Sequence, residues 1–198
     1  MRGRRMNDLI IRDAEEQDTA RLLEIYAPYV TETAVSFEYE SPSVEEFHAR
    51  IETVQREYPY LVAEKDGIII GYAYASPFHP RPAYKHCAVA TIYLDRNYRR
   101  QGIGRELYRK LETILLKQNV FTLYACITIA PEGDPYLSND SEKFHFRIGY
   151  RTKGTYQNCG YKFGRWYSVI WMEKQLAPKP DVPDEFIPYP MIRQCEGE

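Results

Sequence analysis

The chain has 198 residues, of which 44% are hydrophobic and 27% charged, a size that suits one compact domain. It carries 26 basic and 28 acidic side chains, so the net charge of -2 gives no general attraction to nucleic acid or anionic lipid. The longest apolar run, residues 68–75, is too short to cross a bilayer, and the arginines near the N-terminus precede no signal-peptide segment. We expect a cytoplasmic protein with neither a nucleic-acid nor a membrane partner.

The four cysteines predict no metal site. Cys87, Cys126, Cys159 and Cys195 lie far apart and include no Cys-x-x-Cys pair, which argues against a zinc site or a small disulfide scaffold. The apolar neighbours of Cys87 and Cys126 predict buried, reduced thiols.

The first half of the chain predicts two helices and a hairpin. A short strand at residues 9–11 precedes a helix that begins near Glu15 or Asp18, and Ser43 with Glu46 forms a capping-box pattern for a second helix. Tyr60–Glu64 and Ile68–Ala75 read as strands, and the turn between them contains Asp-Gly, a strong hairpin signal.

The second half predicts a strand–helix–strand unit and further strands. The predicted elements after the loop of residues 76–85 are strands Ala88–Leu94, Leu123–Ile129, Arg151–Asn158 and Arg165–Glu173 and helices Gly104–Gln118 and Ser141–Ile148. A strand–helix–strand order favours parallel pairing through a right-handed crossover. The result is a mixed α/β fold with antiparallel hairpins at both ends.

One domain, residues 8–176, is expected to hold these elements, preceded by a flexible arm at residues 1–7. Residues 177–198 form a Pro-rich tail in which five prolines fall between Pro178 and Pro190, a composition that excludes a regular helix or a central strand there. The tail could be disordered, but Phe186, Ile187 and Tyr189 are apolar enough to dock on the domain, and docking is slightly favoured.

The most informative segment joins the strand ending at Leu94 to the helix that follows. Four arginines, at positions 96, 99, 100 and 105, and two glycines, Gly102 and Gly104, lie in or beside this turn. Small residues let the backbone approach a ligand, and the first turn of a helix presents N–H groups that attract anions. The segment lacks the third glycine of a dinucleotide-binding fingerprint and the Gly-Lys-Ser/Thr of a P-loop. It predicts a phosphate-binding turn of another kind.

This turn, Arg99-Arg100-Gln101-Gly102-Ile103-Gly104, resembles the Arg/Gln-x-x-Gly-x-Gly/Ala signature of GCN5-related N-acetyltransferases (GNAT), and in particular the phosphinothricin acetyltransferase group. Supporting stretches run in the expected order over residues 8–176, among them Ser36-Phe37-Glu38, residues 58–64 and Gly160-Tyr161-Lys162. The resemblance implies the GNAT acyl-CoA N-acyltransferase fold, a central, mostly antiparallel twisted sheet with one parallel, splayed strand pair, flanked by helices.

The resemblance also implies acetyl-CoA as co-substrate and direct attack of a primary amine on its thioester. The backbone of Ile92 and Leu94 is expected to bind the pantetheine arm, with a strand N–H polarising the thioester oxygen. The residues expected to hold the pyrophosphate or otherwise to contact the coenzyme are Arg99, Arg100, Gln101, Gly102, Ile103, Gly104, Arg105 and Asn139. Asn139 departs from the family spacing, because Ser138 stands where the family has asparagine.

The sequence departs from the family at the catalytic base, because Val89 occupies the strand position where this group often has a glutamate that acts as general base. His86 or Glu38 could act as the base instead, or a neutral amine and a water could suffice without one. Glu38 could alternatively bind the acceptor, and His86 could be an ordinary loop histidine. His145 lies where the family has a proton donor for the leaving thiolate. The alternative to this catalytic role is that His145 is simply a buried histidine of the helix.

The acceptor wall is expected to include Phe37, Phe78, Arg81 and Tyr84. Arg81 either pairs with a substrate carboxylate or is an ordinary surface arginine. These features favour N-acetylation of a small amine, an amino acid or an analogue such as phosphinothricin or methionine sulfone. A peptide or protein acetyltransferase and a non-catalytic acyl-CoA-binding module remain alternatives. The resemblance implies a homodimer. Most of the 18 tyrosines are expected in the core and the pocket wall.

Overall fold

A computed structural model describes residues 9–196, so the predicted arm at residues 1–7 lies outside the described residues. The described residues form a seven-stranded sheet in the order β1-β2-β3-β4-β5-β7-β6. The strands are β1 (Leu9–Asp13), β2 (Tyr60–Lys65), β3 (Ile68–Pro77), β4 (Cys87–Leu94), β5 (Thr122–Ile129), β6 (Arg151–Lys162) and β7 (Arg165–Gln175). Neighbours are antiparallel except for β4 and β5, which are parallel. The expected fold class is confirmed.

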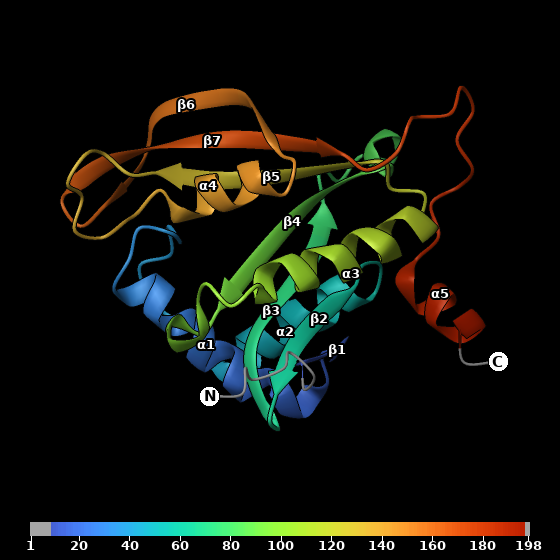
Figure 1. The fold of residues 1–198 in the computed structure, drawn as a ribbon, viewed down its shortest axis with the longest axis horizontal. Helices are drawn as coiled ribbons and strands as arrows, with labels where there is room; N and C mark the ends of the chain where they lie inside the picture. Colours follow the sequence, from blue (N-terminus) through green and yellow to red (C-terminus); the bar gives the residue numbers. More distant parts are fainter. Residues whose placement is uncertain (1–8, 197–198) are drawn as a thin grey trace, which may run out of the picture.

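Helices cover both faces of the sheet (Figure 1). They are α1 (Thr19–Thr31), α2 (Val44–Gln55), α3 (Ile103–Lys117), α4 (Asp140–Arg147) and α5 (Tyr189–Glu196). Leu22 of α1 and Phe47 of α2 pack with Tyr72 of β3 on one face, whereas Leu107 of α3 packs with Leu123 of β5 on the other. Two apolar layers therefore enclose the sheet, because each helix buries one apolar stripe.

Local sequence signals account for several of these elements. Ser43 accepts a hydrogen bond from the N–H of Glu46 and Glu46 reciprocates, which confirms the capping box that begins α2. Asp66 and Gly67 have φ values of 53° and 76°, the left-handed backbone that a tight hairpin turn between β2 and β3 requires.

The parallel pair β4–β5 is short and then opens. Only Cys87, Ala88 and Val89 pair with β5, at Thr122–Tyr124; beyond them β4 stays with β3 and β5 stays with β7. Figure 1 shows the two strands diverging. Because side chains alternate along a strand, Val89, Thr91 and Tyr93 face the α1–α2 side of the gap, and Ala88 and Ala90 face α3.

Two local predictions are wrong. The strand that begins at Arg151 continues to Lys162 rather than ending at Asn158, because register shifts between Thr152 and Gly154 and between Tyr156 and Gly160 absorb its strand-breaking residues as bulges. Cys126 is exposed because its side chain lies on the face of β5 opposite the buried Ala125 and Ile127, and Cys87 at the start of β4 is only partly buried.

The C-terminal segment packs on the domain. Gln118, fully buried after α3, donates to the carbonyls of Glu57 (2.7 Å) and Ile187 (2.9 Å), and the N–H of Tyr189 donates to Glu57 at 3.0 Å. The expectation that residues 178–190 contain no helix is wrong at its end. α5 starts at Tyr189 with Pro190 in its first turn, where a missing N–H costs no intrahelical bond.

Candidate active site

The turn between β4 and α3 has the open backbone that an anionic ligand needs. Gly102 has φ 83°, and its carbonyl accepts from the N–H groups of Arg105 and Glu106 at 3.0 and 3.3 Å, so it caps α3. A Cβ added at Gly102 would meet no atom within 4 Å. Arg99, Arg100 and Arg105 around it are exposed, so their guanidinium groups and the N–H groups of the first turn of α3 offer donors of the kind that bind anions.

Not all of the predicted turn residues face this opening. Ile103 is buried, and a Cβ at Gly104 would lie 3.1 Å from the Phe144 ring and 3.3 Å from Ile92. Gly104 thus allows close approach of α3 to α4 and β4. Gln101 is exposed and accepts from Lys65 at 3.4 Å.

Ile92 and Leu94 lie on the stretch of β4 that continues beyond its last partner on β5. The Leu94 carbonyl accepts from the Tyr29 hydroxyl at 2.6 Å, and Arg99 donates to the same hydroxyl at 3.1 Å. Tyr29 thereby fixes the arginine turn to the end of β4. Across the gap, Asn139 accepts from the Ala130 N–H at 3.0 Å and so holds the end of β5.

His145 is buried, at 3% exposure, in a ring of aromatic side chains. Its Nδ1 lies 2.8 Å from the Ser141 carbonyl, which can only accept, so Nδ1 carries the proton. Nε2 then accepts from the Tyr108 hydroxyl at 2.8 Å. Burial lowers the pKa of His145 to about 4 despite the Ser141 contact. This geometry is that of the buried helical histidine, and its role as proton donor stays a prediction.

The other candidate base, His86, lies at the start of β4, away from the gap. Its Nδ1 donates to the Asn119 carbonyl at 2.7 Å, and its ring packs against Phe121. This histidine holds the turn between α3 and β5. Val89 faces the α1–α2 side and pairs with Ser76 and Tyr124, so neither of these neighbours supplies a carboxylate.

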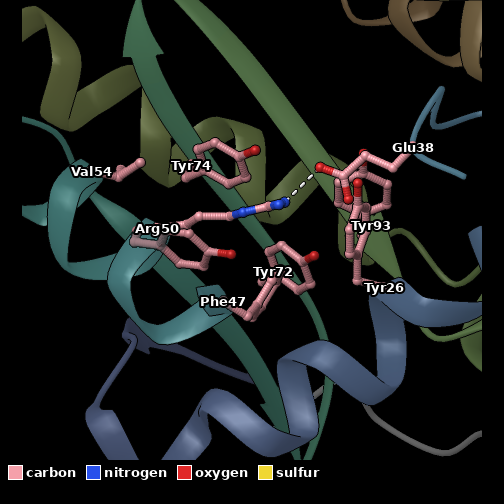
Figure 2. Close-up of a pocket in the computed structure, with 9 residues that line it drawn as sticks. Tyr26, Glu38, Phe47, Arg50, Val54, Tyr72, Tyr74 and Tyr93 are labelled. Atoms are coloured by element: carbon pink, nitrogen blue, oxygen red, sulfur yellow. Dashed lines mark hydrogen bonds and ion pairs between the residues drawn. The ribbon is translucent and has the colours of Figure 1, made fainter. Parts of the chain in front are cut away.

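Glu38, the third catalytic candidate, lines a cavity of ≈ 150 Å³ on the α1–α2 side of the sheet (Figure 2). Its Oε1 accepts from Arg50 of α2 at 2.7 Å. Its Oε2 is buried and has no hydrogen-bond partner among residues 9–196. The remaining lining is mainly aromatic and comprises Tyr26, Phe47, Val54, Tyr60, Tyr72, Tyr74 and Tyr93.

Phe37 and Glu38 are held in place by two contacts from β6. Lys162 is 2% exposed and donates to the carbonyls of Val30 and Ser36, both at 2.6 Å. Burial lowers the pKa of its ammonium group. A Cβ at Gly160 would overlap the Phe37 ring, so only glycine lets that ring lie against β6. The segment between α1 and α2 is therefore attached to the far end of the sheet.

The predicted acceptor wall divides into two parts. Phe78 stacks on Tyr124 at 4.4 Å between ring centroids and contacts Tyr84 and Trp171 at their edges. Phe37 instead packs against Tyr167, and Arg81 is exposed on the loop before η2 (Pro82–Tyr84). Among residues 9–196, no ring contact joins the two parts.

A comparison with known families decides the classification. The model for the acetyltransferase (GNAT) domain matches residues 11–171, most of the chain. The chain belongs to the GNAT acetyltransferase family.

Relatives of this GNAT acetyltransferase include the phosphinothricin N-acetyltransferase of Streptomyces viridochromogenes, 33% identical over 87% of this chain and 91% of that protein. The L-methionine sulfoximine/L-methionine sulfone acetyltransferase of Salmonella typhimurium is 25% identical over 85% of this chain and 95% of its own. The crystal structure of a phosphinothricin acetyltransferase from Sinorhizobium meliloti in complex with AcCoA superposes with a TM-score of 0.78 at 29% identity, covering 92% and 98% of the two chains. The resemblance and the enzyme class are confirmed.

Sequence reasoning missed three features of this GNAT acetyltransferase. Arg50 pairs with Glu38 although the two residues lie 12 positions apart, in a helix and in the connector before it. Tyr29 and Lys162 act through hydrogen bonds to distant backbone carbonyls, for which the sequence carries no pattern. Within residues 9–196 there is no cluster of three metal-ligating side chains and no helix that could span a membrane.

Proposed function

We propose that this GNAT acetyltransferase transfers the acetyl group of acetyl-CoA to the primary amine of a small, amino-acid-like acceptor, by direct attack in a ternary complex. One observation carries the proposal. The stretch of β4 that has no partner on β5 ends just before the arginine–glycine turn, and Tyr93 on this stretch lines the small cavity beside Glu38. Two relatives whose names specify phosphinothricin or methionine sulfoximine and sulfone support an acceptor of this class.

The residues around the gap fit acetyl-CoA, which supplies a reactive thioester when bound. Gly102, the N–H groups of the first turn of α3 and the exposed guanidinium groups of Arg99, Arg100 and Arg105 would bind the pyrophosphate. The open edge of β4 at Ile92 and Leu94 would bind the pantetheine arm as a neighbouring strand would. Val89 can take no proton, so the acceptor enters as the neutral amine. As the amide C–N bond forms, the thioester C–S bond breaks, CoA leaves as the thiolate, and the amine proton goes to solvent.

Small acceptors are favoured over peptides because the segment between α1 and α2 is anchored over the α1–α2 side of the sheet. Lys162 and Gly160 hold that segment from β6, and the cavity beneath it is lined by side chains from five helices and strands and from the segment itself. A peptide acceptor would need a groove that runs across this face.

A homodimer is part of the proposal. β6 is an edge strand, and Tyr156, Tyr161 and Trp166 at this end of the sheet are 58%, 49% and 58% exposed. Exposed large apolar groups along an open edge are typical of an interface. Sedimentation equilibrium should give twice the chain mass, and the double variant Y161E/W166E should sediment as a monomer.

The function is tested by thiol release. Purified enzyme with acetyl-CoA and a thiol reagent should release CoA when phosphinothricin, methionine sulfone or methionine sulfoximine is added, and mass spectrometry should show one acetyl group on the amine. A lysine-containing peptide set is the comparison. Amine-dependent release with peptides alone would overturn the small-acceptor assignment.

A further inference from the structure

The cavity beside Glu38 adjoins the gap where the amine must react. Tyr93 lies on β4 beyond the last residue paired with β5, and Tyr74 is the β3 partner of Thr91 on that same stretch. Both rings line the cavity, as Figure 2 shows. An acceptor whose amine lies in the gap can therefore extend its side chain into the cavity.

The cavity holds one positive and one negative charge. Burial raises the pKa of the hydroxyl groups of Tyr60, Tyr72 and Tyr93, so these rings stay neutral. Arg50 and Glu38 are the charged lining residues, and their sum is zero. A cationic ligand group would be attracted by Glu38 and repelled by Arg50, and an anionic group would be attracted by Arg50 and repelled by Glu38. The pair therefore gives no net preference for a charged ligand.

The hydrogen-bonding capacity of the pair is more selective than its charge. Glu38 Oε1 is occupied by Arg50, whereas Oε2 is buried without a partner in the described part of the chain. A buried carboxylate oxygen without a donor is costly, and a ligand N–H would relieve that cost. The guanidinium group has five N–H donors, so it has donors to spare for a ligand oxygen. Donor and acceptor thus lie side by side.

The size of the cavity limits the ligand. At ≈ 150 Å³ it has the volume of cavities that accept a benzene-sized molecule, about six non-hydrogen atoms. The end of an amino-acid side chain fits, but a second residue of a peptide does not. The aromatic walls suit the methylene and methyl groups of such a side chain, leaving the polar end for Glu38 and Arg50.

We propose that this cavity binds the side-chain head of the amino-acid acceptor, and that Glu38 and Arg50 select an uncharged head with both an N–H donor and an oxygen acceptor, such as a sulfoximine or a carboxamide. The N–H donates to Glu38 Oε2 and the oxygen accepts from Arg50. The inference rests on the proposed function, because it assumes that the amine of the same molecule lies in the gap.

The test compares L-methionine sulfoximine with L-methionine sulfone, which share a skeleton and differ by one N–H in place of an oxygen. We expect the wild-type enzyme to prefer the sulfoximine by about tenfold or more in kcat/KM, because the sulfone presents a second oxygen to Glu38 Oε2. In Glu38→Gln the amide can donate to that oxygen, and the preference should fall below about threefold. Glu40→Gln, an exposed neighbour in the same connector, should keep the wild-type ratio.

Calorimetric binding of both amines to the enzyme–CoA complex separates this inference from the proposed function. Thiol release with both amines but equal kcat/KM in the wild type, or a Glu38→Gln ratio equal to that of Glu40→Gln, would overturn the cavity assignment and leave the function standing. Selective binding of the sulfoximine without thiol release would support the cavity and overturn the function. Absence of both binding and release would overturn both.

Discussion

Replacement of His145 tests whether its ring is held neutral inside the protein. With Nδ1–H on the Ser141 carbonyl and Nε2 accepting from Tyr108, the folded state has no free nitrogen for a second proton. The pKa falls from an ordinary 6.5 to about 4 on folding. Above pH 6.5 both states are neutral and the full stability is present. As pH falls from 6.5 toward 4 only the unfolded state gains the proton, so stability is lost across that window.

The size of the loss follows from the two pKa values. Between pH 7 and pH 5, proton uptake by the unfolded state removes about 2 kcal/mol, and completion of the titration below pH 4 removes about 3 kcal/mol. The variant His145→Phe should be about 1–3 kcal/mol less stable at pH 7, because the buried Tyr108 hydroxyl loses its acceptor. It should lack this part of the acid dependence, so the gap to the wild type narrows as pH falls.

Urea unfolding at pH 7, 6 and 5 measures both quantities, and Tyr108→Phe is the matched control. That variant loses the same hydrogen bond but keeps the titrating ring, so its acid slope should persist. Parallel losses in wild type and His145→Phe between pH 7 and 5 would refute the neutral, buried histidine. Turnover measurements answer the separate question of catalysis. If His145 is a proton donor, turnover of His145→Phe should fall about 10²-fold or more across pH 6–9; if it only packs, turnover should stay near the wild-type value over that range.

Three further changes address the coenzyme turn, the acceptor side and the base. Gly160→Ala places a Cβ within 2.6 Å of atoms of the Phe37 ring, so kcat/KM for the acceptor should fall about 10- to 100-fold while the KM for acetyl-CoA stays unchanged. Gly154→Ala on the same strand is the control, because its Cβ would have no atom within 4 Å. Gly102→Val requires a β-branched residue to adopt φ 83°, so it should raise the KM for acetyl-CoA about tenfold or more. An unchanged KM would show that the pyrophosphate does not bind at this turn. Val89→Glu should raise kcat/KM at pH 6.5 about tenfold by supplying a base, and an unchanged pH profile would contradict the placement of the amine beside this residue.

The fold was predictable from sequence because its main signals are local. Asp66-Gly67 determines a hairpin, Ser43 with Glu46 begins a helix, and a strand–helix–strand order sets the parallel pair. Each signal depends on residues within a few positions of one another. The prediction failed where a residue had to be judged against distant neighbours, as with Cys126, whose apolar flanks do not show that its own face of β5 is open.

The site was predictable only in part for the same reason. The coenzyme turn is one continuous segment with a recognisable composition, whereas the cavity joins side chains from five helices and strands and the connector. Glu38 was a candidate, but its unpartnered oxygen and its contact with Arg50 emerge only when the connector lies over the sheet. The same holds for His145, whose chemistry depends on Tyr108 of another helix.

The docked C-terminal segment determines when the fold can be completed during synthesis. Gln118 binds both Glu57 and Ile187, and the buried side chains of Tyr189 and Ile192 pack in the core beside Tyr58. These contacts can form only after residues 187–192 have left the ribosomal exit tunnel, which happens later than for the residues of the sheet that they cover. The nascent sheet must therefore wait with part of its apolar surface uncovered, and a stalled or truncated product would expose that surface to chaperones and proteases.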